Sequence, residues 1–391
     1  MSEARPGSPL RIAVLGDFDG LHTRRWLEVF VARGHDLHAI SFYPPREVLP
    51  GVTVHALSPV AAPSASLERA DSRRRLRDLA PPSLMRFVHA QRYRRAGLRR
   101  VLDDIKPDVL HAHYVVEHGY YGSLAGFHPY VVSAWGSDLL VESHKPLGRL
   151  IARRALRSAD FVTGNDASLL QRAIELGVPP ERTAVVHLGT ERRFLDAGAD
   201  SVNLRDAAST LTVISDRALE PLYNIDVVLR AFPALRQSVP EARLVIAHDG
   251  SQRQILEALA VQLGLGDSVR FAGRLDAAAL AVALAQAQVY VSVPSSDSFA
   301  VSTLEAMGAG AFPVLSDLPS AHGWVEDGVD ALIVPPRNVD ALAAALQRAL
   351  SDDALRRSTA EANRSKVEAG GLRERTMLQM ERIYYRLVEG A

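Results

Sequence analysis

The sequence contains no cysteine, and it has no apolar run long enough to span a membrane. The lack of cysteine excludes thiol nucleophiles, iron–sulfur clusters and cysteine-ligated zinc. The lack of a long apolar run leaves no candidate for a membrane-spanning helix. Residues 1–10 also lack the apolar segment of a signal peptide, so we expect a cytoplasmic protein.

The chain also has no net charge, because its 45 basic residues balance 45 acidic ones. Arginine is nevertheless concentrated between Glu68 and Arg100, where apolar residues recur at roughly helical spacing. A basic amphipathic pair of helices is typical of peripheral attachment to an anionic membrane surface, here the inner face of the cell membrane. A solvated helix face that shields a sheet has the same composition, so both interpretations stay open.

What the chain does contain is a regular alternation of short apolar segments and helical patterns, typical of α/β proteins built from βαβ units. The alternation stops at residues 195–209, which are rich in Ala, Asp, Gly and Ser, and then restarts. We therefore expect two Rossmann-like domains with doubly wound parallel sheets, at 1–195 and 205–370, and a final helix at 372–391 that joins the first. Two such domains facing each other place a ligand cleft between the carboxyl ends of their strands.

Strands are expected where short apolar runs are bounded by turn residues. In the first half they lie at residues 11–15, 37–42, 109–114, 130–134, 161–164 and 184–188. In the second half they lie at residues 211–214, 243–247, 269–272, 289–293, 312–315 and 331–334.

The strongest chemical signal is the segment from Pro294 to Asp317, in which a buried strand ends in a polar loop and a helix begins near Ser302. The backbone N–H groups at the start of a helix form a ready site for an anion. Asp297 and Glu305 flank this turn. Carboxylates do not bind phosphate, but they accept hydrogen bonds from the hydroxyls of a ribose or a hexose. Together these groups match the needs of a nucleotide sugar.

This segment resembles the signature of the retaining glycosyltransferases of family 4, and the resemblance spans about residues 11 to 350. The matching residues are Asp297, Phe299, Glu305, Ala306, Met307, Gly310, Pro313 and Val314. The resemblance implies the GT-B fold, with two Rossmann-like domains facing an interdomain cleft. It also implies transfer of a hexose from a nucleoside-diphosphate sugar to an acceptor hydroxyl, with no metal and no cofactor.

The resemblance assigns roles to the two acids and to the loop between them. Glu305 looks like the carboxylate that holds the donor ribose, and Asp297 like the one that meets the hydroxyls of the sugar. The family usually has Glu at the position of Asp297 and Gly at the position of Ala300. These two differences leave the identity of the donor sugar open. The expected donor-binding residues of this loop are Phe299, Ala300, Val301 and Ser302.

A second signal lies in the loop after the first strand of the C-terminal half. Family members carry an arginine and a lysine here, and both cations clasp the diphosphate. Arg217 matches the arginine, whereas Tyr223 and Asn224 occupy the Lys-Gly positions. One lost cation costs roughly ten- to hundredfold in donor affinity. Arg217 therefore carries more of the charge, or another arginine substitutes.

Further candidates end two strands of the first half. His111 and His113 lie on one strand, and Trp135 and Asp138 follow the next. Family members often have a histidine near the reacting carbon at the position of Trp135, so that general base is missing. Retaining transfer does not require one, because the departing phosphate oxygen can take the acceptor's proton. We expect His113 and Asp138 to act in the cleft, and no third ligand stands near the histidines to bind a metal.

The remaining candidates are glycines and one cation in loops. Gly20 follows the first strand, in a loop that is not a dinucleotide fingerprint. We expect it to let the backbone approach the donor. Gly250, Gly273 and Arg274 match weaker family positions around the nucleotide.

Two other classes of protein share this fold. A non-catalytic nucleotide-sugar binder or scaffold of the same fold would explain the departures from the family pattern. A pyridoxal-phosphate phosphorylase needs a Schiff-base lysine, but Lys106, Lys145 and Lys366 all lie away from the phosphate motif. The expected partners are a nucleotide-sugar donor and a sugar, lipid-linked or small-molecule acceptor, and no nucleic acid.

Overall fold

The computed structural model describes residues 7–57, 82–199, 201, 205 and 210–390, with side chains from residue 94 onward in the helix that begins at Pro82. The basic stretch from Glu68 to Arg100 therefore lies partly outside the described residues. Its second part forms α2, Pro82–Ile105.

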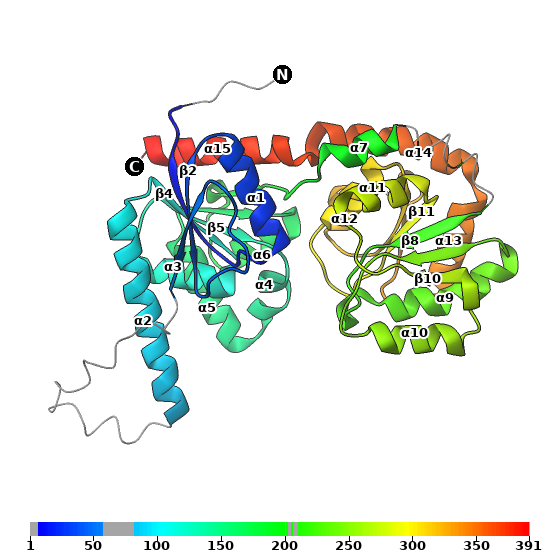
Figure 1. Ribbon diagram of the computed structural model, residues 1–391, viewed down its shortest axis with the longest axis horizontal. Coiled ribbons are helices and arrows are strands. Elements are labelled where there is room, and N and C mark those ends of the chain that lie inside the picture. The colour runs from blue at the N-terminus through cyan, green and yellow to red at the C-terminus, as the bar shows by residue number, and fades with distance from the viewer. Residues whose placement is uncertain (1–6, 58–81, 200, 202–204, 206–209, 391) are drawn as a thin grey trace. The chain divides into compact units, whose positions relative to one another are not determined.

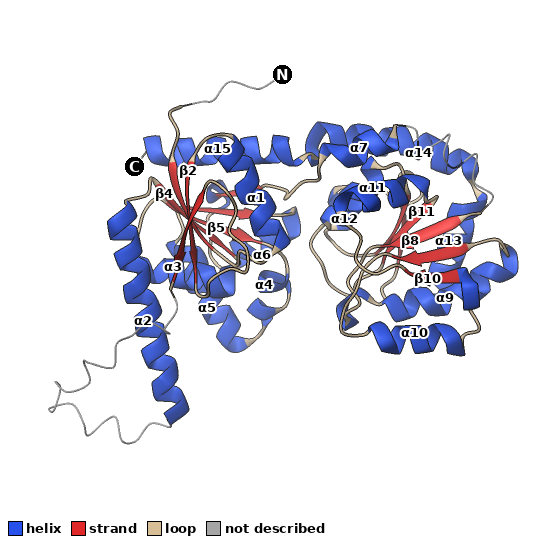
Figure 2. Cartoon of the chain, viewed as in Figure 1, coloured by secondary structure: helices blue, strands red, loops and turns tan. Residues whose placement is uncertain are grey.

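The chain forms two compact units (Figure 1). Unit 1 comprises Met1–Gly164, Leu169–Val185 and Gln379–Ala391, and unit 2 comprises Asn165–Ser168 and Val186–Leu378. The last helix, α15 (Arg373–Glu389), begins in unit 2 and ends in unit 1. Each unit consists of a parallel sheet with helices packed on it (Figure 2).

The sheet of unit 1 has the strand order β3-β2-β1-β4-β5-β6-β7 among the described residues. The order reverses between β1 and β4, and loops at such a switch point commonly bind ligands in open α/β sheets. The strands are β1 Arg11–Leu15, β2 Asp36–Ser41, β3 Val52–Ala56, β4 Val109–His113, β5 Tyr130–Ala134, β6 Phe161–Gly164 and β7 Thr183–Val185. The helices besides α2 are α1 Leu21–Ala32, α3 Tyr120–Ala125, α4 Ser137–Leu140, α5 Pro146–Ser158 and α6 Ala167–Glu175.

The end of α15 completes the core of unit 1. Glu381 is fully buried and accepts two hydrogen bonds from Arg33, at 2.7 and 2.6 Å, and its Oε1 lies 2.7 Å from Nε2 of His35. The hydroxyl of Tyr384 lies 2.5 Å from Nδ1 of His111, on β4. Residues far apart in the sequence therefore share one interior.

The sheet of unit 2 has the strand order β10-β9-β8-β11-β12-β13 in the described part of the chain, so its switch point lies between β8 and β11. The strands are β8 Thr212–Ser215, β9 Arg243–Ile246, β10 Val269–Phe271, β11 Val289–Ser292, β12 Phe312–Ser316 and β13 Leu332–Val334. The helices are α7 Arg192–Gly198, α9 Ile225–Ser238, α10 Arg253–Gln262, α11 Ala277–Gln286, α12 Val301–Gly308, α13 Val339–Ser351 and α14 Asp353–Lys366.

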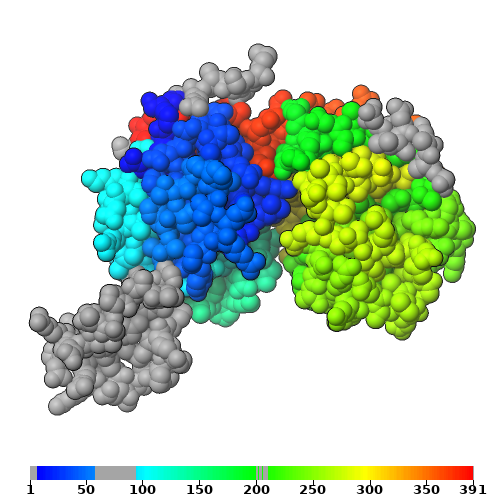
Figure 3. Space-filling view, in the orientation of Figure 1, coloured from blue at the N-terminus to red at the C-terminus, as the bar shows by residue number. Residues whose placement is uncertain are grey.

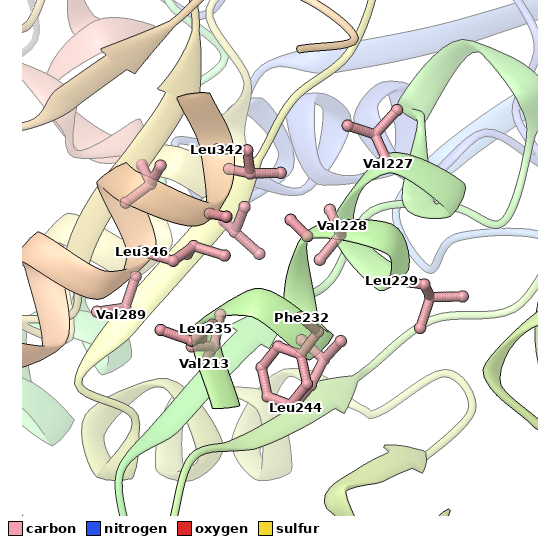
Figure 4. Close-up of a cluster of buried hydrophobic side chains, with 14 of the residues drawn as sticks. Val213, Val227, Val228, Leu229, Phe232, Leu235, Leu244, Val289, Leu342 and Leu346 are labelled. Atoms are coloured by element: carbon pink, nitrogen blue, oxygen red, sulfur yellow. The ribbon is translucent and has the colours of Figure 1, made fainter. Parts of the chain in front are cut away.

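The core of unit 2 lies on both faces of its sheet. On one face α9 and α13 pack against β8 and β11, with Phe232 of α9 and Leu346 of α13 fully buried (Figure 4). On the other face α7, α11 and α12 bury a second cluster that includes Phe194 and Met307. Because both faces are covered, the strands read as continuous apolar runs.

Two elements differ from the sequence expectation. The strand β3 was missed because its residues are half-exposed at the edge of the sheet and form no continuous apolar run. The helix α7 lies where the composition predicted the start of a linker, because Phe194 and Leu195 are buried in the core of unit 2. The compact units therefore divide after Val185, before the boundary predicted from composition.

Candidate functional site

The predicted residues of unit 2 meet at its switch point. Arg217 follows β8, and Asp297 follows β11 in the loop that leads to α12. The carboxyl ends of β8 and β11 are neighbours in the sheet, so the two loops lie side by side.

Arg217 is held between these loops by three side chains. Its Nη2 donates a hydrogen bond to Oδ2 of Asp297 at 2.5 Å, and its Nη1 donates to Oγ of Ser302 at 2.9 Å. The guanidinium carbon lies 4.3 Å from the centre of the Tyr223 ring, a cation–π contact. Within the described residues its buried Nε has no hydrogen-bond partner.

The charge on Arg217 is permanent. Its side chain is only 10% exposed, and this burial disfavours the charged form. The acidic groups around it, Asp297 first and then Tyr290, Tyr223 and Asp216, together outweigh burial, so the pKa of Arg217 lies above its usual value. The site therefore presents a fixed cation whose Nε–H donates to no residue in the described part of the chain.

Ser302 links this cation to the interior of the unit. It lies in the first turn of α12, and its Oγ is 2.8 Å from the hydroxyl of Tyr290 on β11. Burial raises the pKa of Tyr290, which keeps the phenol neutral. Glu305 lies one turn further along α12, on the same side of the helix as Ser302, and is 5% exposed.

Sequence reasoning missed two residues that hold the loop before α12. Asn165 donates a hydrogen bond to the carbonyl of Phe299 at 2.7 Å, and Asp166 accepts one from the N–H of Phe299 at 3.2 Å. Phe299 was expected among the donor-binding residues, but its N–H already donates to this carboxylate. The available signal was a polar pair placed directly after the buried strand β6.

The ring of Phe299 packs within unit 2. It stacks on Trp324 with ring centres 5.3 Å apart and planes at 9°, and Trp324 also meets His187 edge to face. Phe299 is 4% exposed. Its side chain therefore shapes the loop, and the first-turn N–H groups of Val301 and Ser302, next to Ala300, remain the candidate anion donors.

Asn224 joins three loops. It has a left-handed φ of 52°, precedes α9, and is 1% exposed. Its Nδ2 donates to the carbonyl of Val293 and to Oγ of Ser295, each at 2.8 Å. Its Oδ1 accepts from Nη1 of Arg337 at 2.7 Å. Arg337 also has a left-handed φ, 62°, and its side chain is 60% exposed.

The three glycines predicted from the sequence differ in how strictly their positions require glycine. A Cβ on Gly250 would lie 2.6 Å from the carbonyl oxygen of Leu219, so only glycine lets the loops after β8 and β9 approach this closely. Gly273 has a φ of 73°, which also favours glycine, and the adjacent Arg274 is exposed. In unit 1, Gly20 precedes α1 with an ordinary φ of −71°, and a Cβ there would lie 3.3 Å from the carbonyl of Asp17.

The predicted residues of unit 1 meet at the other switch point. His113 ends β4, and a Cβ on Gly16 after β1 would lie 3.6 Å from its Cβ. The ring of His113 is 4.7 Å from that of Trp135, and both its nitrogens are buried without a partner among the described residues. Burial, reinforced by His111 and His118, holds the pKa of His113 well below its usual value. The imidazole is therefore neutral near pH 7, which makes His113 a poor base.

Asp138 is fully buried and fixes the backbone around this point. Its carboxylate accepts from the N–H groups of Val115 and Gly136 at 2.9 Å, Leu139 at 3.0 Å and Trp135 at 3.3 Å. Burial raises the pKa of Asp138, and these hydrogen bonds oppose the shift. Since its oxygens are used in this way, Asp138 joins the loops after β4 and β5.

His111 makes the stability of unit 1 depend on pH. Burial lowers its pKa to about 3, whereas an unfolded histidine titrates near 6.5. The buried, neutral imidazole therefore stabilises the folded state fully above about pH 6.5, and this stabilisation is lost as the pH falls toward 3. We expect the free energy of unfolding to fall by roughly 2 kcal/mol between pH 8 and pH 5 on account of this residue.

Urea titrations of the wild type and His111→Gln at both pH values measure this difference. The variant should show a smaller pH dependence, while His144→Gln, at an exposed position, should retain the wild-type slope. Equal slopes for His111→Gln and the wild type would contradict the assignment.

Two findings concern the whole of the described chain. No described helix combines the length and apolar character needed to cross a bilayer. The described residues also contain no cluster of three or more histidine or carboxylate side chains arranged to hold a metal ion.

Comparison with known proteins identifies the class of protein. The family of glycosyl transferases group 1 matches residues 203–366, and the family of glycosyl transferase 4-like proteins matches residues 11–166. Both units therefore carry the pattern of sugar-transferring enzymes. The chain belongs to the family 4 glycosyltransferases of GT-B fold.

Curated relatives cover most of the chain at modest identity. A phosphatidyl-myo-inositol mannosyltransferase of Mycobacterium leprae is 29% identical over 301 residues, which are 66% of this chain and 80% of the relative. A D-inositol 3-phosphate glycosyltransferase of Kribbella flavida is 27% identical over 398 residues, 91% of this chain and 88% of the relative.

Solved structures show the same fold. Sucrose-phosphate synthase from Thermosynechococcus elongatus matches with a TM-score of 0.75 at 19% identity, covering 98% of this chain and 100% of that one. Anabaena HepE in complex with UDP also matches with a TM-score of 0.75, at 18% identity, covering 97% and 100%. At these identities the likeness concerns the fold alone.

Proposed function

We propose that this glycosyltransferase moves a hexose from a nucleoside-diphosphate sugar to an acceptor hydroxyl, with retention at the anomeric carbon and without a metal ion. The observation that carries the proposal is the position of Arg217. Its permanent charge lies at the switch point of unit 2, beside the first turn of α12, with Asp297 in the loop before this helix and Glu305 on the helix itself.

The proposed donor site works by exchange of ion pairs. Without donor, Asp297 neutralises Arg217. A diphosphate takes the place of this carboxylate on the guanidinium and also meets the first-turn N–H groups of Val301 and Ser302. Asp297 is then available to accept hydrogen bonds from the sugar hydroxyls, and Glu305 accepts those of the ribose.

The proposed chemistry relies on fixed charge. Negative charge grows on the leaving diphosphate, and a preorganised cation stabilises it most in the transition state. The neutral His113 is a poor base, so the departing phosphate oxygen takes the proton of the acceptor on the same face. That geometry retains the configuration of the transferred sugar.

Relatives narrow the substrates to test first. HepE structures contain UDP and UDP-glucose, and two relatives are named for transfer to inositol compounds. UDP-, GDP- and ADP-hexoses should therefore be screened with inositol phosphates and phosphatidylinositol as acceptors.

The test is release of nucleoside diphosphate, followed by proton NMR of the product. One donor is expected to be turned over with retained anomeric configuration and with no loss of rate in EDTA. An inverted product, or a rate abolished by EDTA and restored by a divalent ion, contradicts the mechanism. Tight nucleotide binding without release or transfer would instead identify a non-catalytic binder.

Arg337 is the proposed second cation of the donor site, in place of the lysine that the family pattern leads one to expect near Tyr223. It reaches this loop from the segment after β13, and its hydrogen bond to Asn224 orients it there. Arg337→Gln should weaken binding of the nucleoside diphosphate about tenfold or more. Arg337→Lys keeps the charge and should lose much less.

Isothermal titration with the preferred nucleoside diphosphate measures both affinities. Arg348→Gln, an exposed arginine on α13, serves as the control and should bind like the wild type. If the lysine and glutamine variants at 337 bind equally well, charge at this position plays no part in donor binding.

A further inference from the structure

The helix α5 in unit 1 has an unusual face toward solvent. Its buried side is made by Ala152, Ala155 and Leu156. On the solvent side, Leu147 and Leu150 are 68% and 67% exposed. Residues three apart lie next to each other on a helix, so the two leucines form one apolar patch.

Arginines surround this patch. Arg149, Arg153, Arg154 and Arg157 are all exposed on the same helix. No salt bridge to any of the four occurs within the described residues, whereas the neighbouring Lys145 pairs with Glu142 at 2.8 Å. The blue-green part of the chain that contains α5 lies at the surface of unit 1 in Figure 3.

The solvent-facing arc of α5 therefore combines two exposed leucines with four guanidinium groups that form no salt bridge to a described residue. An exposed apolar side chain alone does not distinguish α5 from other helices of the chain. Ile255 on α10 is 66% exposed, but the adjacent Arg253 is paired with Asp249 and Glu257. On α5 the unpaired charge and the apolar surface coincide.

We propose that this face of α5 lies on the surface of a membrane that contains anionic lipids. The leucines enter the headgroup region, and the arginines meet lipid phosphates, as in interfacial amphipathic helices. A second copy of the chain is a poorer partner, because a symmetric contact would bring eight unpaired cations together. A nucleic acid would leave the leucines without a partner. The proposal is independent of the proposed transferase chemistry.

Vesicle co-sedimentation of the full chain tests the proposal. One set of vesicles contains phosphatidylcholine alone, and the other contains equal parts of phosphatidylcholine and phosphatidylglycerol. The protein is expected to bind the second set at low salt. Each arginine removed should weaken partitioning about fivefold, so Arg153→Gln/Arg154→Gln should lose roughly 25-fold.

The apolar contribution is tested separately. Leu147→Ser/Leu150→Ser keeps all charges and should still weaken partitioning about tenfold. The matched control is Ile255→Ser on α10, which should partition like the wild type. All substituted side chains are exposed, so the thermal midpoint serves as a check that folding is unchanged.

Three outcomes would overturn the proposal. The first is that the wild type binds neither vesicle. The second is that both α5 variants bind as the wild type does, which would assign membrane binding to another part of the chain. The third is concentration-dependent dimerisation lost in the leucine variant, which would assign the face to a second copy. Transfer to a water-soluble acceptor should be the same for all variants.

Discussion

Replacing Arg217 by alanine is expected to lower kcat/KM for transfer by about two to three orders of magnitude. The guanidinium is the buried cation of the proposed donor site, and its Nε–H has no partner in the described part of the protein. Steady-state assays with the preferred donor measure the loss. Arg243→Ala provides a matched control, because that arginine begins β9 at the opposite end of the same sheet and should retain full activity.

A double variant tests the ion pair between Arg217 and Asp297 directly. Loss of Arg217 leaves the carboxylate of Asp297 without its partner, and this charge repels a diphosphate. Asp297→Asn in the Arg217→Ala background should therefore recover part of the affinity for the nucleoside diphosphate. Asp297→Asn alone should leave that affinity unchanged or stronger while lowering turnover. Arg217→Ala with near-wild-type kcat/KM would remove the basis of the proposed site.

Asp138→Ala is expected to produce the largest loss of stability. It leaves the backbone N–H groups around Asp138 buried without an acceptor, and each such group costs about 1–3 kcal/mol. The free energy of unfolding of unit 1 should fall by at least about 3 kcal/mol, which lowers the thermal midpoint by roughly 6–12 °C.

Differential scanning calorimetry with Asp160→Ala as control checks this expectation. Asp160 also accepts a backbone hydrogen bond, from Tyr130 at 2.7 Å, but its side chain is 34% exposed. Water can replace the lost acceptor there, so the cost should be about 1 kcal/mol. A smaller effect at Asp138 than at Asp160 would mean that its loops are held by other contacts.

The sequence was sufficient for the fold because burial on both faces makes most strands visible as apolar runs. Every strand expected from the sequence overlaps a strand in the structure, and β3 was missed because its residues are half-exposed. The start of α7 looked like a linker by composition. Its assignment to unit 2 depends on the burial of Phe194, which only the tertiary structure reveals.

The site was predictable in outline because parallel strands bring their carboxyl ends to one edge. That rule placed Arg217, Asp297 and Ser302 near one another before any contact was known. It could not show that Arg217 and Asp297 neutralise each other, because an ion pair depends on side-chain geometry. The rule also could not show that the side chain of Asn224 is fully hydrogen-bonded within the protein. One of its partners, Arg337, comes from a loop that is distant in the sequence.

The helix α15 has a consequence for the order in which the protein is made. Arg33, His35 and His111 of unit 1 are synthesised before unit 2, yet the interior that they share also needs Glu381 and Tyr384. Until those residues are translated, Arg33 and His35 lack their carboxylate and His111 lacks its phenol. The interior of unit 1 is therefore completed only after Val186–Leu378 of unit 2 has been synthesised.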